Sequence, residues 1–402
     1  MTIGHRRRTA VATLAAGLLL ATPATAAHAL PATAPATSAN STTAPTLELP
    51  RPTGPYAVGT DVLHLTDRAR TDPWVPDAGH REVMVSVHYP ARPGGTGAST
   101  PYISTKEAEA LLWGLGLDDD APAELSSIAT HARTGATAAR GRFPLLLLSP
   151  GFGNPRATLT SLAEDLASRG YVVASIDHAY ESSGTAFPGG RILRCAACDA
   201  VEAAPDEAAK QEVAKAVSTG RAADLSFVLD RLTGSRPAWG NARMIDRRRV
   251  AAAGHSIGGS AAVSTMLTDP RIDAGINMDG TFFDPIPRSG TGDRPFLMLG
   301  TEADHPAGGK DVSWEQSWNR LDGWKRWLTV RGSHHSSFTD IPVFAERIGL
   351  PIDPAATLSP ERSTGITRDY VAAFLDLHLK NRPQPLLDGP SPDNPEVVFQ
   401  HH

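Results

Sequence analysis

The feature that most constrains the fold is the sequence Gly-His-Ser-Ile-Gly at residues 254–258. A short run of small apolar residues precedes it and a run of good helix formers follows, which is the strand–turn–helix context of a nucleophile elbow. The turn presents the Ser256 hydroxyl and directs the Ile257 N–H, at a helix N-terminus, toward the charge that develops on an attacked carbonyl oxygen. A chance match in a chain with 36 glycines is the alternative. The flanking pattern favours a catalytic serine.

Short apolar runs alternate with segments of helical periodicity along the rest of the chain. The predicted strands are residues 61–65, 83–89, 143–148, 171–176, 251–255, 272–278, 295–299 and 327–330, and the predicted helices are residues 156–168, 208–232 and 368–379. This alternation predicts an α/β protein with a mostly parallel central sheet and helices on both faces. With the elbow it indicates the α/β-hydrolase fold. Ligands of such sheets bind beyond the carboxyl ends of the strands.

The first 50 residues differ in composition from the rest of the chain. Residues 1–29 carry three arginines, a short apolar stretch and small-x-small cleavage sites, which are typical of a secretory signal peptide. Residues 30–50, rich in Pro, Ala, Ser and Thr, are predicted to be a flexible linker. Residues 51–402 then form a single catalytic domain. No other stretch is long enough to span a bilayer, so we expect a secreted protein without a transmembrane segment.

Charge and cysteine content narrow the range of partners. The net formal charge of −5 lacks the basic surface that a nucleic-acid partner requires. The only cysteines, Cys195 and Cys198, are expected to form a disulfide in an exported protein. A redox role is disfavoured because no thioredoxin-like strand precedes the pair and a helix is expected only later. Metal binding would need two more ligands, which the sequence does not suggest, so no cofactor is expected.

A serine is a weak nucleophile unless a base removes its proton. This fold orders its catalytic residues Ser, acid, His along the chain. The His334–His335 pair directly follows the last predicted strand and supplies the candidate base. Two carboxylates compete to orient that base: Asp279 follows the strand 272–278, and Asp304 follows the strand 295–299. Fold logic alone leaves this choice open.

The second oxyanion donor is expected from the loop after the early buried strand. That loop has the sequence Ser-Pro-Gly-Phe-Gly at residues 149–153, whose glycines allow the backbone to curl inward. The Phe152 N–H is the predicted donor, and a plain Pro-Gly turn is the alternative.

Several stretches together resemble the plasma-type platelet-activating-factor acetylhydrolases and the related actinobacterial lipase-like hydrolases. The resemblance runs from about residue 54 to residue 380. The stretches that carry it are LSPGFG at 148–153, DLASRGYVVA at 165–174, GHSIGG at 254–259, GINMD at 275–279 and VRGSHHSSFTD at 330–340.

This resemblance implies a calcium-independent serine esterase that removes short acyl chains from phospholipids. It implies Ser256 as nucleophile, Asp279 as acid, His335 as base, and Phe152 and Ile257 as oxyanion donors. The residues after Asp279 depart from the family pattern, which is expected to alter the acyl pocket. The resemblance also implies weak contact of the apolar stretch 107–117 with a lipid surface, although the three aspartates that follow it oppose docking on anionic membranes. A helix that covers the core is the alternative for this stretch.

We therefore expect a secreted carboxylester hydrolase that acts on an ester or phospholipid small molecule. A lipase or cutinase-like hydrolase of triglycerides or polyesters is the alternative among esterases. A serine peptidase and a non-catalytic binding protein of the same fold are the alternatives from other classes.

Overall fold

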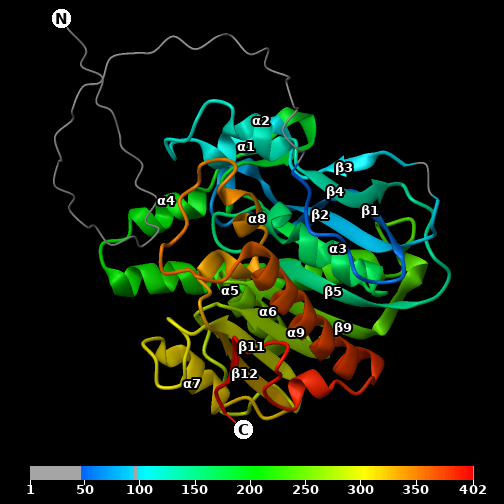
Figure 1. Cartoon of the computed structure of the whole chain (residues 1–402). Helices are drawn as coiled ribbons and strands as arrows, with labels where there is room; N and C mark the ends of the chain where they lie inside the picture. The colour runs from blue at the N-terminus through cyan, green and yellow to red at the C-terminus, as the bar shows by residue number, and fades with distance from the viewer. Residues whose placement is uncertain (1–46, 95–96, 402) are drawn as a thin grey trace, which may run out of the picture.

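A computed structural model describes residues 47–94 and 97–401 of the chain (Figure 1). The predicted signal peptide and most of the predicted linker lie outside the described residues. The described residues form an 11-stranded sheet in the order β13-β12-β11-β10-β9-β5-β6-β2-β1-β4-β3, with β7 (Thr185–Phe187) and β8 (Arg191–Leu193) in a separate hairpin. The fold is thus organised around one large sheet.

The six central strands are parallel, as their continuous apolar character predicts. They are β6 (Val172–His178), β5 (Phe143–Ser149), β9 (Ile245–His255), β10 (Ala274–Met278), β11 (Phe296–Thr301) and β12 (Lys325–Val330). The long strand β2 (His80–Ala91) pairs antiparallel with β6, and β1 (Ala57–Thr71) pairs antiparallel with β2. Short strands complete the two edges: β4 (Ala129–Thr134) and β3 (Ser99–Pro101) beyond β1, and β13 (Val397–Phe399) beside β12.

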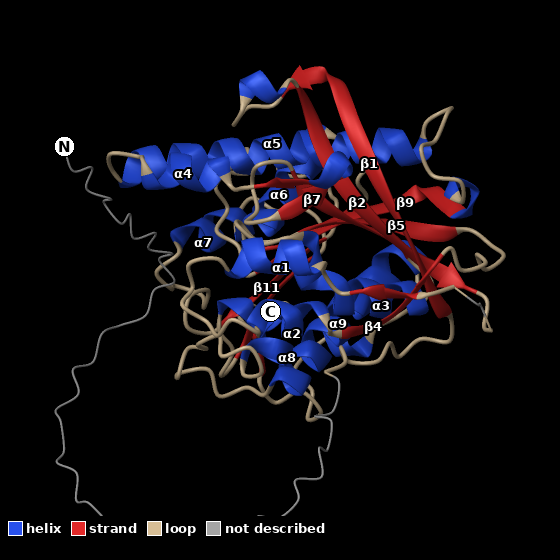
Figure 2. Ribbon diagram, turned by 90° about the horizontal axis from the view of Figure 1, so that it is seen from above, coloured by secondary structure: helices blue, strands red, loops and turns tan. Residues whose placement is uncertain are grey.

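Helices cover both faces of the sheet (Figure 2). One face packs against α5 (Glu207–Thr233), α6 (Ile257–Thr268) and α7 (Val312–Trp318), and the other packs against α3 (Thr160–Ser168) and α9 (Pro360–Lys380). Each helix contributes apolar side chains to a core cluster in which the sheet residues are almost completely buried. The expected mostly parallel sheet with helices on both faces is confirmed.

The remaining α-helices of the described residues are short. They are α1 (Thr105–Leu112), α2 (Ala121–Ser126), α4 (Ala196–Glu202) and α8 (Ile341–Ala345). The helix expected at 368–379 begins earlier, because Ser359 caps its first turn and Pro360 occupies its first position. In the described part of the chain, none of the helices combines the length and apolarity that crossing a bilayer requires.

Two local expectations differ from the structure. The last four residues of the predicted linker are packed on the domain: Leu49 is 1% exposed, and its N–H donates to the Ala129 carbonyl at 3.0 Å. The other concerns the cysteine pair, because α4 begins directly at Cys195, which caps it, rather than later in the chain. The first difference arises from a partner distant in sequence, and the second from a local cap within the Cys195–Cys198 loop.

Candidate active site

The predicted nucleophile lies at a sharp turn between β9 and α6. Ser256 has φ 55° and ψ −127°, a backbone conformation that a non-glycine residue adopts only at an energetic cost. The flanking glycines make the turn possible, because a Cβ on Gly254 would lie 2.2 Å from the Gly258 carbonyl carbon and one on Gly258 would lie 2.2 Å from the Ser149 oxygen. The turn leaves the Ser256 side chain partly exposed beyond the end of β9.

The loop that carries Phe152 leaves β5 and passes beside the elbow. A Cβ on Gly151 would lie 2.8 Å from the Nδ1 of His255, so the absence of a side chain permits the close approach. Phe152 and Ile257 then pack in one small apolar cluster. The structure therefore brings together the two residues whose N–H groups are the predicted oxyanion donors.

His335 and Asp279 meet beside the elbow. The Nδ1–H of His335 donates to Asp279 Oδ2 at 2.6 Å. Asp279 directly follows β10, is buried and has φ 56°. Burial opposes its ionisation, yet hydrogen bonds from His305 and His335 hold the pKa of Asp279 well below its usual range. The carboxylate is thus charged at neutral pH and can orient the His335 imidazole.

The competing candidates lie elsewhere. Asp304 is exposed, and its carboxylate accepts from the Thr301 hydroxyl at 3.3 Å, a contact within its own loop. The backbone N–H of His334 donates to Ser337 Oγ at 2.9 Å, so His334 caps the turn that contains His335. Of the two acids that the sequence proposed, the structure therefore places Asp279 against His335.

A second histidine, His305, contacts the Asp279 carboxylate and was not predicted from the sequence. The Nδ1 of His305 lies 2.7 Å from Asp279 Oδ1, its Nε2 lies 3.3 Å from Asp311 Oδ2, and its ring stacks on Trp314 at 4.2 Å. Burial lowers the pKa of His305, but hydrogen bonds to the two carboxylates outweigh it and raise this pKa to about 9. His305 is accordingly an imidazolium at neutral pH. Its position six residues before Asp311, after a predicted strand, was the only available signal.

His255 connects the elbow to the loop of His335. Its Nε2–H donates to the His335 carbonyl at 2.8 Å, and the two rings are 4.6 Å apart. Burial, followed by the electrostatic effect of the neighbouring His335, lowers the pKa of His255 to about 3, so the ring is neutral. A neutral ring at this place holds the base loop without adding a charge beside the nucleophile.

The disulfide between Cys195 and Cys198 is formed, as expected. It packs in the same apolar cluster as Phe152 and Ile257, together with Trp74 and Phe283. Among the described residues, no group of three or more His, Cys, Asp or Glu side chains is placed to hold a metal ion.

Comparisons with protein families and with known proteins find matches to esterases. The family described as platelet-activating factor acetylhydrolase, isoform II, matches residues 41–188 and 210–384. A probable 1-alkyl-2-acetylglycerophosphocholine esterase of Arthroderma benhamiae is 29% identical over 382 residues, which cover 87% of this chain and 93% of that protein. The platelet-activating factor acetylhydrolase of Gallus gallus is 24% identical over 309 residues, covering 67% of this chain and 71% of that protein.

Among solved structures, the ferulic acid esterase from Streptomyces cinnamoneus superimposes with a TM-score of 0.78. It is 44% identical and covers 89% of this chain and 100% of its own. Fold, elbow and relatives thus define a carboxylic ester hydrolase of the α/β-hydrolase fold. Because one family matches most of its length, the chain belongs to the platelet-activating factor acetylhydrolase isoform II family.

Proposed function

We propose that this protein hydrolyses carboxylic esters through an acyl-enzyme formed on Ser256, with His335 as base and Asp279 as acid. The observation that carries the proposal is the 2.6 Å hydrogen bond from His335 Nδ1 to the buried Asp279 carboxylate, next to a serine held at positive φ. This bond fixes the imidazole tautomer whose Nε2 is free to accept a proton.

The chemistry follows from that geometry. Ser256 Oγ attacks the ester carbonyl while its proton passes to His335 Nε2, and the N–H groups of Phe152 and Ile257 bind the resulting oxyanion. The proton then passes to the leaving alkoxide, which departs as an alcohol and leaves an ester on Ser256. Water, deprotonated by His335, attacks this ester and releases the carboxylic acid and the free serine.

For the substrate we propose a short acyl ester of a phospholipid, in line with the names of the family and of the Arthroderma benhamiae relative. Trp113, within the stretch 107–117, supports weak contact with a lipid surface: its side chain is 64% exposed beyond α1, and Arg194 lies over its ring at 5.0 Å. We also propose that residues 1–29 direct export of the chain and that residues 51–402 form one catalytic domain.

An ester of an aromatic acid is a second candidate, favoured by the 44% identity to a ferulic acid esterase. The cluster of Trp74, Phe152, Phe283 and the disulfide provides apolar and aromatic surface beside Ile257. Aromatic acyl groups pack well on such surfaces.

One panel separates these possibilities. Turnover is measured for p-nitrophenyl esters of rising chain length, ethyl ferulate, a 1-alkyl-2-acetyl phosphocholine lipid, a triglyceride, a polyester film and a peptide amide. The proposal expects ester turnover that Ser256→Ala abolishes, and labelling by a fluorophosphonate probe at Ser256 alone. Labelling or turnover that persists in Ser256→Ala would remove the proposed nucleophile. Preference for ethyl ferulate over the phospholipid would select the second candidate.

A further inference from the structure

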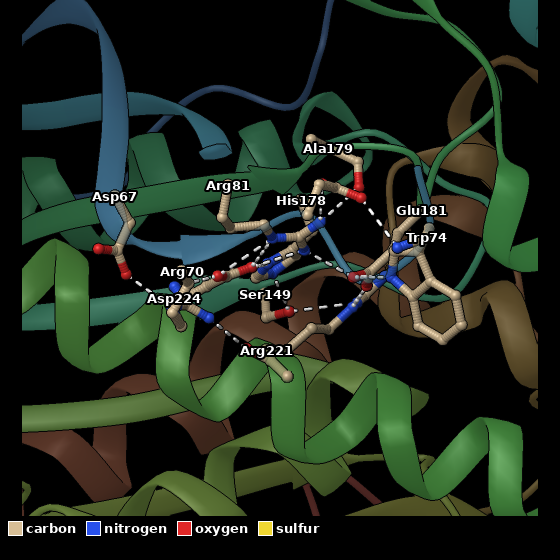
Figure 3. Close-up of polar contacts among 12 residues, drawn as sticks. Asp67, Arg70, Trp74, Arg81, Ser149, His178, Ala179, Glu181, Arg221 and Asp224 are labelled. Atoms are coloured by element: carbon tan, nitrogen blue, oxygen red, sulfur yellow. Dashed lines mark hydrogen bonds and ion pairs between the residues drawn. The ribbon is translucent and has the colours of Figure 1, made fainter. Parts of the chain in front are cut away.

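A buried group of charged side chains contacts the loop that carries Phe152, and Figure 3 shows most of its members. We call it the loop cluster, and its members are Asp72, Arg81, His178, Glu181, Arg221 and Asp224. Each of these side chains is at most about 1% exposed. They come from β2 and its preceding loop, from β6 and its following loop, and from α5.

Arg221 reaches from α5 to the loop itself. Its Nη1 donates to the Pro150 carbonyl at 2.5 Å and to Ser149 Oγ at 3.3 Å, while its Nε donates to Glu181 Oε2 at 2.7 Å. One guanidinium therefore joins the backbone on one side of Phe152 to a buried carboxylate.

Glu181 completes the attachment on the other side of Phe152. Its backbone carbonyl accepts from the Gly153 N–H at 3.0 Å, and the Gly153 carbonyl accepts from Ser183 at 2.9 Å. The Glu181 carboxylate is held in turn by Arg81 at 2.6 Å and by the Trp74 indole N–H at 2.9 Å. The residues before and after Phe152 are thus fixed to the same Arg221–Glu181 pair.

Stabilisation of the fold does not by itself account for a buried cluster of charged side chains. The desolvation of buried ions offsets much of their attraction, and apolar residues of similar volume are often as stable. A planar guanidinium, however, fixes geometry, because its N–H groups point in set directions. An oxyanion hole needs this fixed geometry, since its donors act only where charge develops in the transition state.

We propose that Arg221 and Glu181 are positioning residues that hold the Phe152 N–H at the oxyanion hole. The inference rests on the proposed function, in which Phe152 is an oxyanion donor. Both side chains are about 1% exposed, so neither is placed to touch a substrate. They act through the carbonyl of Pro150 and the N–H of Gly153.

The test is Arg221→Met, assayed per fluorophosphonate-labelled serine so that unfolded protein does not count. Loss of one oxyanion donor costs on the order of 10² to 10³ in kcat. We expect kcat to fall roughly 100-fold while KM changes less than about threefold, since the donor acts mainly on the transition state.

A trifluoromethyl ketone supplies a readout that a merely structural role would not move. Its adduct with the serine places an oxyanion in the hole, so its affinity should fall by the same factor as kcat/KM. The matched control is Arg70→Met. Arg70 donates to Asp224 at 2.6 Å from the edge of the loop cluster and does not touch the loop, so this variant should stay within about threefold of the parent.

Two further variants keep the test decisive if Arg221→Met fails to fold. The double variant Glu181→Gln with Arg221→Met removes both charges together and leaves no unpaired buried ion. Arg221→Lys retains the charge but lacks the fork that contacts both Glu181 and Pro150, so we expect an intermediate loss of about tenfold.

The outcomes are distinct. Turnover in Arg221 variants equal to the parent, an equal loss in Arg70→Met, or unchanged affinity for the ketone would each overturn the positioning role. These results would leave the proposed function intact as long as Ser256→Ala is inactive. Turnover that survives in Ser256→Ala would instead remove the proposed function.

Discussion

Replacing Asp279 by Asn tests the proposed acid, and the two histidines around this residue define the expected result. The carboxylate accepts from His335 on Oδ2 and contacts His305 on Oδ1. An amide has only one oxygen. The imidazolium of His305 is the stronger donor, so the Asn oxygen should face His305 and the NH₂ group should face His335.

That orientation forces His335 into the tautomer with Nδ1 unprotonated and Nε2 protonated, which cannot accept the serine proton. A comparable substitution in a well-studied serine protease lowers kcat about 10⁴-fold, or about 5 kcal/mol of activation free energy. We therefore expect Asp279→Asn to lose at least roughly 1000-fold in kcat. Asp304→Asn is the matched control and should remain within about tenfold of the parent, because its partner is a threonine in its own loop.

A double variant tests the amide argument itself. His305→Leu in the Asp279→Asn background removes the competing cation and leaves the Thr301 N–H, which lies 2.7 Å from Oδ1 in the parent, as the donor that still competes with His335 for the Asn oxygen. We expect kcat to recover about tenfold relative to Asp279→Asn, a coupling that independent sites would not show. The measurement is steady-state kinetics on a p-nitrophenyl ester. A crippled Asp304→Asn, with Asp279→Asn active, would refute the assignment, and the absence of recovery would refute the role of His305 in orienting the amide.

Three further outcomes are expected. His335→Ala should be as inactive as a variant without the nucleophile, whereas His334→Ala should keep kcat within about tenfold, because His334 contributes a backbone cap. Intact-mass analysis of alkylated, unreduced protein should show no adduct on Cys195 or Cys198, and two adducts would contradict the disulfide. The pKa of His305 is raised to about 9 in the folded protein, so its charged form stabilises the fold. This contribution is complete at a pH below the pKa of His in the unfolded chain, about 6.5, and is lost as the pH rises through about 9. The free energy of unfolding of His305→Gln should therefore be lower than that of the parent by the largest amount below about pH 6.5. The two values should converge above about pH 9, which chemical denaturation at several pH values would measure.

The sequence predicts the structure correctly where a short local pattern of residues determines it. The elbow around Ser256 needs glycine at fixed positions, and buried parallel strands need continuous apolar runs, so both could be located from the chain alone. The disulfide followed from two cysteines at close spacing. The carboxyl ends of the strands then indicated the edge of the sheet at which the site residues meet.

Contacts between residues on different strands and loops could not be predicted in the same way. Asp279 and Asp304 both follow parallel strands, and only the path of the loop after β12 decides which carboxylate meets His335. His305 was missed because its partner, Asp279, lies 26 residues away. Arg81 and Asp224 are separated by 143 residues and carry no local pattern at all. Such ion pairs are visible only once the fold is known.

The attachment of residues 47–51 bears on the order in which the chain can fold. Arg368, in the C-terminal helix α9, donates to the carbonyls of Pro50 at 2.8 Å and Arg51 at 2.9 Å, more than 300 residues away. The start of the domain therefore cannot reach its final place until nearly the whole polypeptide has been synthesised. Contacts of such long range slow folding, because the intervening chain must first be ordered.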